Sequence, residues 1–181
     1  MEKLVNELRT RIRLVKPDDA STLAHLVQSN ADYLRPWEPT RDPRFFTEEG
    51  QLDFVCSALE AHAQGKSVPF VIERVDGTVL GRLNLNGLIH GAFQSCAMSY
   101  WVRADYKGQG HATEAVLEAV EYAFSELGLH RIQAETLIEN KASQRVLRKA
   151  GFRLFGLAEE YLCINGRWRD HILFQRVQNE L

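Results

Sequence analysis

The chain of 181 residues has no apolar run long enough to cross a membrane and no excess of basic residues. A membrane-spanning helix needs about 20 consecutive apolar residues, and residues 1–7 lack the apolar core of a signal peptide. A formal net charge of −2 provides no electrostatic basis for binding nucleic acid. We therefore expect a cytoplasmic protein with no membrane partner and no direct nucleic-acid partner.

Cysteine is also scarce. The three cysteines, Cys56, Cys96 and Cys163, are odd in number and far apart in the sequence. They show neither the pairing of a disulfide framework nor the short spacing of metal ligands. We expect reduced thiols, which is typical of a cytosolic protein, and no metal site.

Hydrophobic residues make up 45% and charged residues 25% of the chain, and no repeat or low-complexity segment divides it. This composition favours a single domain over residues 1–181, in which helices and strands alternate as a mixed α/β fold. Strands are expected at 10–15, 69–74, 79–85, 96–102, 131–136, 152–158 and 171–177. Helices are expected at 18–29, 48–64, 113–127 and 141–150.

Local signals set several boundaries. Asp18 is a candidate cap for the first helix, and Asn140 for the last one. The proline-rich segment 33–39 and the segment 86–94 are expected to be loops. The Asn165-Gly166 pair predicts a two-residue hairpin turn.

Residues 104–113 are the most informative segment, because a glycine-bearing turn there joins a strand to a helix. Such a turn presents several backbone N–H groups at the positive end of the helix dipole, which suits an anion such as a diphosphate. Two familiar phosphate loops do not fit. A dinucleotide fingerprint would need a glycine at Thr113, and a Walker A loop would need Lys-Ser/Thr after Gly110. An ordinary tight connection remains the alternative.

The segment from Lys107 to Ala112 resembles the pyrophosphate loop of the GNAT N-acetyltransferases, Q/R-x-x-G-x-G/A. It departs from the motif at Lys107, where that family has Gln or Arg. A second match follows one helix and one strand later, where Asn140 and Ser143 form an Asn-x-x-Ser segment. The plain interpretation of Asn140 is a helix cap, and capping does not exclude a role in catalysis.

The segment 159–173 is similar to the C-terminal hairpin of the RimJ/RimL group, the ribosomal-protein-alanine N-acetyltransferases. Tyr161-Leu162, Asn165-Gly166 and Trp168-Arg169-Asp170-His171 carry this likeness, and segment 33–37 extends it to nearly the whole chain. Physically, Asp170 is expected to pair with a neighbouring arginine, Arg167 or Arg169. The resemblance implies a central, mostly antiparallel twisted sheet flanked by helices.

The resemblance implies transfer of an acetyl group from acetyl-CoA to a primary amine, with CoA as the product. The implied acceptor is the N-terminal α-amine of a protein or peptide, possibly a ribosomal protein, and the protein would be a monomer or a homodimer. It assigns the cofactor contacts to Trp101, Val102, Lys107, Gly108, Gln109, Gly110, His111, Ala112, Thr113 and Asn140.

Three features of this implied site concern the cofactor. The strand around Trp101 and Val102 would carry a bulge that frees backbone groups for the pantetheine arm, with the Val102 N–H as a candidate oxyanion donor. The loop would hold the diphosphate mostly through backbone donors, with the His111 side chain beside it. Ser143 would protonate the departing thiolate.

The general base is open between Glu135, Glu160 and Tyr161, because a surface role is the simpler interpretation of any single carboxylate. An α-amine, with a pKa of about 8, loses its proton more easily than lysine. No local spacing assembles a nucleophilic triad, so direct attack without a covalent enzyme intermediate is expected. The alternatives are acetylation of a small amine or antibiotic, and a CoA-binding sensor module without turnover.

Overall fold

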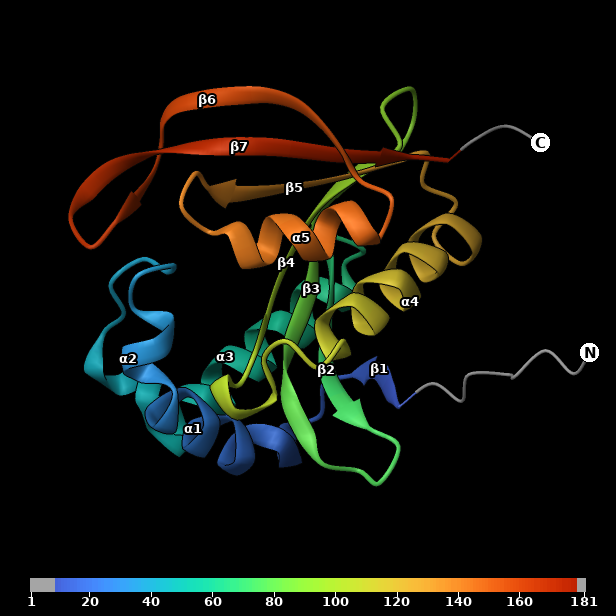
Figure 1. The fold of residues 1–181 in the computed structure, drawn as a ribbon. Helices are drawn as coiled ribbons and strands as arrows, with labels where there is room; N and C mark the ends of the chain where they lie inside the picture. The colour runs from blue at the N-terminus through green and yellow to red at the C-terminus, as the bar shows by residue number, and fades with distance from the viewer. Residues whose placement is uncertain (1–8, 179–181) are drawn as a thin grey trace, which may run out of the picture.

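One seven-stranded sheet organises residues 9–178, which are the residues that the computed structural model describes (Figure 1). The strand order is β1-β2-β3-β4-β5-β7-β6. Neighbouring strands run antiparallel except β4 and β5, which are parallel. The mixed α/β architecture with a mostly antiparallel sheet is the one expected from the sequence.

The elements alternate along the chain. The strands are β1 (Thr10–Leu14), β2 (Ser67–Arg74), β3 (Val79–Ile89), β4 (Ser95–Val102), β5 (Arg131–Leu137), β6 (Arg153–Ile164) and β7 (Arg167–Val177). The α-helices are α1 (Ala20–Ser29), α2 (Ala31–Leu34), α3 (Glu48–Ala63), α4 (His111–Ser125) and α5 (Lys141–Lys149). Three short 3-10 helices are η1 (Pro17–Asp19), η2 (Pro43–Phe46) and η3 (Ala104–Tyr106). None of the described helices is long and apolar enough to cross a membrane.

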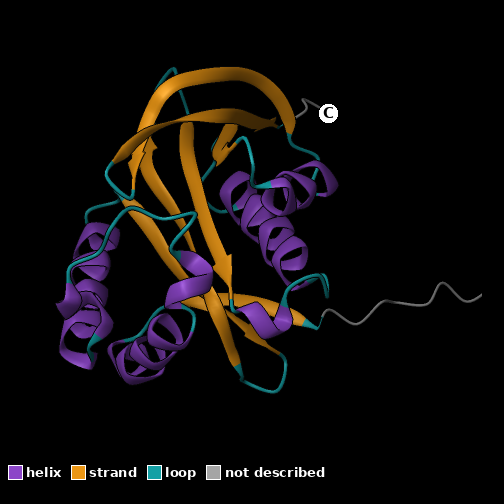
Figure 2. Ribbon diagram, turned by 60° about the vertical axis from the view of Figure 1, so that its left-hand side comes forward, coloured by secondary structure: helices purple, strands orange, loops and turns teal. Residues whose placement is uncertain are grey.

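Helices cover both faces of the sheet, and Figure 2 shows them as two groups on opposite sides of the strands. Strand β2 shows the division, because successive side chains of a strand point to opposite faces. Phe70 and Ile72 belong to the larger core cluster, which α4 and α5 cover, whereas Val71 packs with residues of α1 and α3. The two faces of the sheet are therefore called the α4–α5 face and the α1–α3 face.

The parallel pair of strands separates after a short contact. Strands β4 and β5 pair only over residues 95–97 and 131–133. Beyond that point β4 keeps β3 as its partner and β5 keeps β7. Within the described residues, no strand fills the gap between Met98–Val102 of β4 and Ala134–Leu137 of β5, a gap called the wedge below.

The expected cap of the first helix was wrong. Asp18 is exposed and caps nothing, while its neighbour Asp19 turns inward to accept hydrogen bonds from the Lys16 N–H at 2.8 Å and from Arg13. Helix α1 therefore begins after Asp19, at Ala20. The choice between two adjacent aspartates depended on Arg13, which lies on the strand before them.

The two expected loops begin later than the sequence suggested. Residues 31–34 form the short helix α2, which ends before Pro36. Strand β3 continues to Ile89, because pairing with β4 supports its last residues across a register shift, and only residues 90–94 turn. The Asn165-Gly166 turn is confirmed, since both residues have the positive φ of a two-residue hairpin, 50° and 74°.

A glycine in β3 lets two strands approach closely beside the wedge. A Cβ atom on Gly81 would lie 2.0 Å from the Trp101 carbonyl oxygen, whereas one on Gly156 in β6 would meet its nearest atom, a methyl carbon of Leu173, at 3.6 Å. We predict that Gly81→Ala lowers the free energy of unfolding by about 2 kcal/mol, because backbone atoms must move apart.

The matched control is Gly156→Ala, which should change the free energy of unfolding by less than about 0.5 kcal/mol. Chemical denaturation of both variants gives the comparison. Equal stability of the two variants would contradict the close approach of β3 to β4.

Candidate active site

The loop between β4 and α4 has the geometry of an anion site. Gly108 and Gly110 have φ values of 76° and 98°, which side-chain-bearing residues rarely adopt. This backbone leaves the N–H groups of residues 108–112 without an acceptor among the described residues. The last two of these residues form the first turn of α4, so the helix dipole reinforces the unpaired donors.

An arginine outside the loop holds it in place. The Arg9 guanidinium donates to the Gln109 carbonyl oxygen at 2.8 Å and to Glu114 at 3.1 Å. The ammonium group of Lys107 lies 5.8 Å from the ring centroid of Tyr33, which ties the start of the loop to α2. Lys107 therefore makes a contact with α2 at the motif position where the family has Gln or Arg.

His111 does not present its side chain to the loop, which corrects the expectation. Its ring is buried, with Nδ1 at 2.7 Å from the Thr10 hydroxyl and an edge contact with Tyr106. Burial lowers the pKa of His111, which favours the neutral ring. Its backbone N–H is the part of this residue that belongs to the loop.

The free backbone groups of β4 have a different origin from the expected bulge. The register of β3 and β4 is regular from Gly81–Val102 to Asn86–Ala97, and the only shift in this pair lies beyond Asn86. Hydrogen-bonding directions alternate along an antiparallel strand. Because the Arg103 N–H donates to the Leu80 carbonyl at 2.8 Å, the Val102 N–H is directed away from β3, into the wedge.

A hydroxyl pair joins the wedge to α5. Ser143 Oγ lies 2.8 Å from the Tyr100 hydroxyl, although 43 residues separate them in the sequence. Burial raises the pKa of Tyr100, so its phenol keeps its proton at neutral pH. Asn140 caps α5 as expected, with its side-chain oxygen accepting from the Ser143 N–H at 3.1 Å. Tyr100 was missed from the sequence, and alternation along β4 was the one available sign that it faces α5.

The candidate bases differ in burial. Glu135 on β5 is partly buried, and this burial raises the pKa of its carboxyl group. Glu160 is exposed, at a bulge of β6 where its φ is 47°. The Tyr161 ring packs on His171 at 5.4 Å between centroids, and burial together with the charge of Glu135 raises its pKa.

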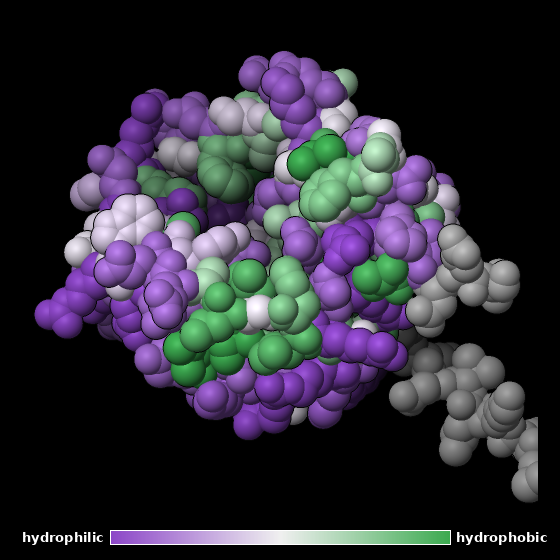
Figure 3. Space-filling view, turned by 90° about the horizontal axis from the view of Figure 1, so that it is seen from above, coloured by the Kyte–Doolittle hydropathy of each residue, from purple (hydrophilic) through white to green (hydrophobic). Residues whose placement is uncertain are grey.

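The hairpin of β6 and β7 corrects one further expectation. Asp170 pairs with neither Arg167 nor Arg169, because its carboxylate accepts the Glu160 backbone N–H at 2.9 Å and so stabilises the bulge. Arg169 instead pairs with Glu139, which lies just before α5, at 3.0 Å. At the tip, the Asn165 amide donates to the Arg35 carbonyl at 2.8 Å and connects the hairpin to α2. Figure 3 looks down on β6 and shows hydrophobic surface beside hydrophilic surface there.

The geometry therefore combines an anion loop with a wedge that has free backbone groups. The two strands beside the wedge carry the ionisable residues Tyr100 and Glu135. A family model described as the acetyltransferase (GNAT) domain matches residues 9–153. The chain belongs to this family of acetyltransferases, and the resemblance stated from the sequence is confirmed.

Among curated proteins, the [ribosomal protein uS5]-alanine N-acetyltransferase of Escherichia coli is 33% identical over 166 residues, 91% of this chain and 86% of that protein. The probable N-acetyltransferase YjcK of Bacillus subtilis is 34% identical over 161 residues, 88% of this chain and 89% of that protein. These similarities place the chain with the RimJ-type N-acetyltransferases, as expected.

Solved structures agree with this placement. The ribosomal-protein-S5-alanine acetyltransferase of Vibrio fischeri has a TM-score of 0.88 at 32% identity, covering 93% of both chains. Mycobacterium smegmatis RimJ in complex with CoA-disulfide has a TM-score of 0.89 at 33% identity, covering 92% of this chain and 80% of that one. The protein is thus an N-acetyltransferase.

Proposed function

We propose that this protein transfers the acetyl group of acetyl-CoA to the N-terminal α-amine of a protein, with a ribosomal protein as the favoured acceptor. The observation that carries the proposal is the wedge, which lies between an anion loop and a helix-capping Asn-x-x-Ser segment. The names of the relatives support the acceptor, since two of them act on an N-terminal alanine of a ribosomal protein. Such an acceptor places the reaction in the cytoplasm.

The residues present fit acetyl-CoA. The unpaired N–H groups of residues 108–112 suit a diphosphate, because charge-assisted hydrogen bonds favour anionic acceptors. The free backbone edge of β4 suits the amide groups of a pantetheine arm, and the Asn140 side chain lies at the end of the opposite strand. The Val102 N–H is the candidate donor to the oxyanion. When bound, the cofactor supplies the thioester that the amine attacks.

Ser143 is the proposed acid. Its hydroxyl can donate to the departing thiolate while the Tyr100 hydroxyl donates to Ser143 Oγ. Because burial keeps Tyr100 protonated, Tyr100 can donate to Ser143 Oγ while Ser143 donates its own proton to the thiolate. Tyr100 therefore positions and supports Ser143.

Glu135 is the proposed base. It shares a face of the sheet with Trp101, since Ala97 on β4 pairs with Gln133 on β5 and side chains alternate from there. A raised pKa brings a carboxylate closer to that of the amine and makes it a better proton acceptor. Glu160 is the rival, and within residues 9–178 no hydrogen bond or ion pair orients its exposed carboxylate.

Thiol release from acetyl-CoA tests the proposed function directly. We expect release that depends on peptides with a free N-terminal alanine, and little release with polyamines, amino acids or N-terminally blocked peptides. The same peptides should gain one acetyl group on the α-amine by mass spectrometry. Release with small amines alone would contradict the acceptor class, and CoA binding without release from any amine would contradict catalysis.

Ser143→Ala should reduce kcat by about 10²-fold, within the range of general acid catalysis. Affinity for acetyl-CoA should stay near that of the wild type, because the backbone donors of the loop are unchanged. Calorimetry and initial rates separate the two effects. The control is Ser125→Ala at the exposed end of α4. An unchanged kcat in Ser143→Ala would remove this residue from the mechanism.

The pH dependence of kcat/KM tests Glu135. A base acts when deprotonated, so activity rises as pH increases through the raised pKa of Glu135 and then through that of the amine. In the wild type, a plot of log(kcat/KM) against pH should have a slope of about 2 at low pH, because both groups must lose a proton. In Glu135→Gln the slope should stay at about 1. Glu159→Gln is the surface control and should keep the wild-type profile. If Glu160→Gln, and not Glu135→Gln, loses the slope of about 2 at low pH, the base is Glu160.

A further inference from the structure

Arg82 is a buried cation without an ionic partner. It lies on β3, is only 6% exposed, and none of the described carboxylates comes within ion-pair distance of it. Its Nε atom has no hydrogen-bond acceptor, and one guanidinium nitrogen donates to the Gln51 side chain at 3.3 Å. Burial lowers the pKa of Arg82 to about 10, so it stays charged at neutral pH.

This arrangement contrasts with the other buried charges on the same face. Glu73 is 2% exposed and pairs with Arg11 and with Arg13 at 2.6 and 2.7 Å. Asp19 is paired with Arg13 at 2.8 Å. The charge of Glu38 acts on Arg82 from beyond ion-pair distance. Because a buried charge without a close partner costs several kcal/mol, the position of Arg82 indicates an anion that the described residues do not provide.

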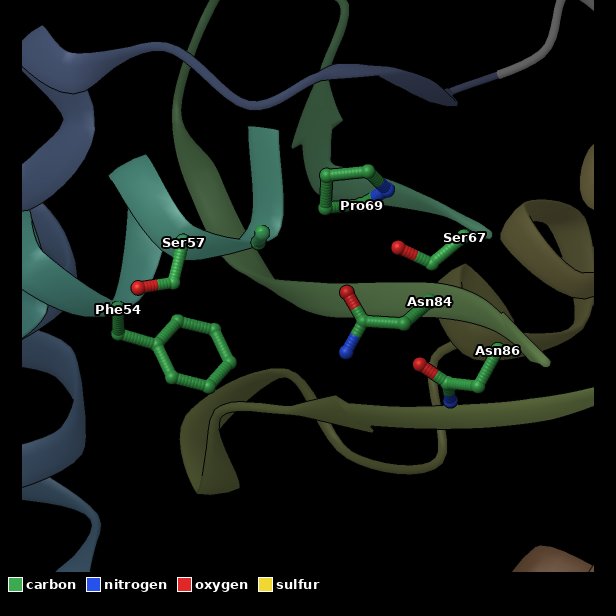
Figure 4. A pocket seen from close by; sticks show the side chains of 7 residues that line it. Phe54, Ser57, Ser67, Pro69, Asn84 and Asn86 are labelled. Carbon is green, nitrogen blue, oxygen red and sulfur yellow. The ribbon is translucent and has the colours of Figure 1, made fainter. Parts of the chain in front are cut away.

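The surroundings of Arg82 can admit such an anion. Its guanidinium carbon lies 4.3 Å from the ring centroid of Phe54 and 5.7 Å from that of Phe45. Phe45 lines a cavity of about 430 Å³ between α1, α2, η2 and the tip of the β6–β7 hairpin. Phe54 lines a smaller cleft of about 240 Å³, where Figure 4 shows Asn84 between the ring and Asn86. The cation therefore lies behind two rings that each line a cavity on the α1–α3 face, and a shift of either ring would open a path from that cavity to Arg82.

The larger cavity is basic. Arg35 and Arg41 line it together with one carboxylate, Glu38. Arg35 pairs with Asp32, and Glu38 pairs with Arg41 at 3.7 Å. Arg41 also lies over the Phe45 ring, at 4.8 Å from its centroid. With Arg82 behind the same ring, the balance of charge favours a carboxylate over an ammonium group.

The sheet register places Arg82 near the reaction site. Arg82 is the cross-strand partner of Trp101, and its side chain shares the α1–α3 face with Glu135. Two strand spacings and one side-chain step separate Arg82 from Glu135, which is roughly 12 Å or more between Cα atoms. An extended peptide advances about 3.4 Å per residue, so a side chain three to five residues from the amine would reach Arg82.

We propose that Arg82 determines acceptor specificity by binding the carboxylate of an aspartate or glutamate at the third to fifth position of the acceptor protein. This inference rests on the proposed function and deepens it, because it names the chemical class of acceptor. Arg82 suits the task, since its planar guanidinium can hold a carboxylate with two parallel hydrogen bonds.

The test uses peptides with N-terminal alanine that differ by one glutamate-to-glutamine exchange at position 3, 4 or 5. For at least one position, kcat/KM of the wild type should be about 10-fold or more higher for the glutamate peptide, mostly through KM. In Arg82→Gln this ratio should fall to about 1, while the affinity for acetyl-CoA stays near the wild-type value and the thermal midpoint does not fall. Arg82→Lys should keep a reduced ratio, and it carries the test if Arg82→Gln does not fold.

Arg44→Gln is the matched control, because it removes one positive charge from an exposed side chain of η2 that pairs with Glu49 and Asp53. It should keep the wild-type ratio. Equal use of glutamate and glutamine peptides at all three positions by the wild type would overturn the inference while leaving the proposed function intact. An equal loss in Arg44→Gln would overturn it too, since general electrostatics would then explain the preference. Absence of transfer to every peptide would instead count against the proposed function.

Discussion

The separation of β4 from β5 after three residue pairs is the constraint on which the site depends. In a continuous sheet, both strands would use their hydrogen-bonding groups on each other. Here one edge of each strand remains open over the wedge. Because β4 and β5 are parallel, their carboxyl ends lie at the same end of the gap, and α4 and α5 both begin just beyond them. One interruption thus provides a free backbone edge and two helix N-termini together.

The sheet also separates the two substrates. Helices α4 and α5 carry the anion loop and Ser143, which act on the proposed cofactor. The opposite face carries Glu135, Trp101 and Arg82, and residues of α1, α2, α3 and η2 line two cavities on that side of the sheet. A thioester held in the wedge would be accessible from both faces, so attack by an amine needs no covalent enzyme intermediate. The chemistry then depends on proton transfers at Glu135 and Ser143 and on donors already in place.

The sequence predicted those parts of the site that depend on neighbours along the chain. Gly108, Gly110 and Asn140 act through local backbone geometry, so glycine spacing and a capping residue were enough to locate the loop and the start of α5. The family resemblance predicted the sheet and the acetyltransferase class. The choice of Asp18 over Asp19 failed because Arg13, on another element, decides which aspartate turns inward.

Features that depend on distant contacts were not predictable in the same way. The Tyr100–Ser143 pair joins residues that only the fold brings together, and the burial that distinguishes Glu135 from Glu160 depends on where β7 and β6 lie. The expected bulge in β4 was wrong for a related reason: its free groups come from the departure of a neighbouring strand, which the sequence of β4 does not encode. Nothing in the sequence distinguishes Arg82 from an ordinary strand residue. Only the structure shows that none of the described carboxylates forms an ion pair with it.

The central claim is that the loop amides at the start of α4 bind a diphosphate at the mouth of the wedge. Calorimetry with CoA, dephospho-CoA and pantetheine tests it most directly, because only pantetheine lacks the diphosphate. Adenosine is the control for the nucleoside that pantetheine also lacks, and it should bind no more tightly than pantetheine. We predict that dephospho-CoA binds within about 10-fold of CoA and that pantetheine binds at least about 100-fold more weakly. Pantetheine binding as tightly as CoA would contradict the account.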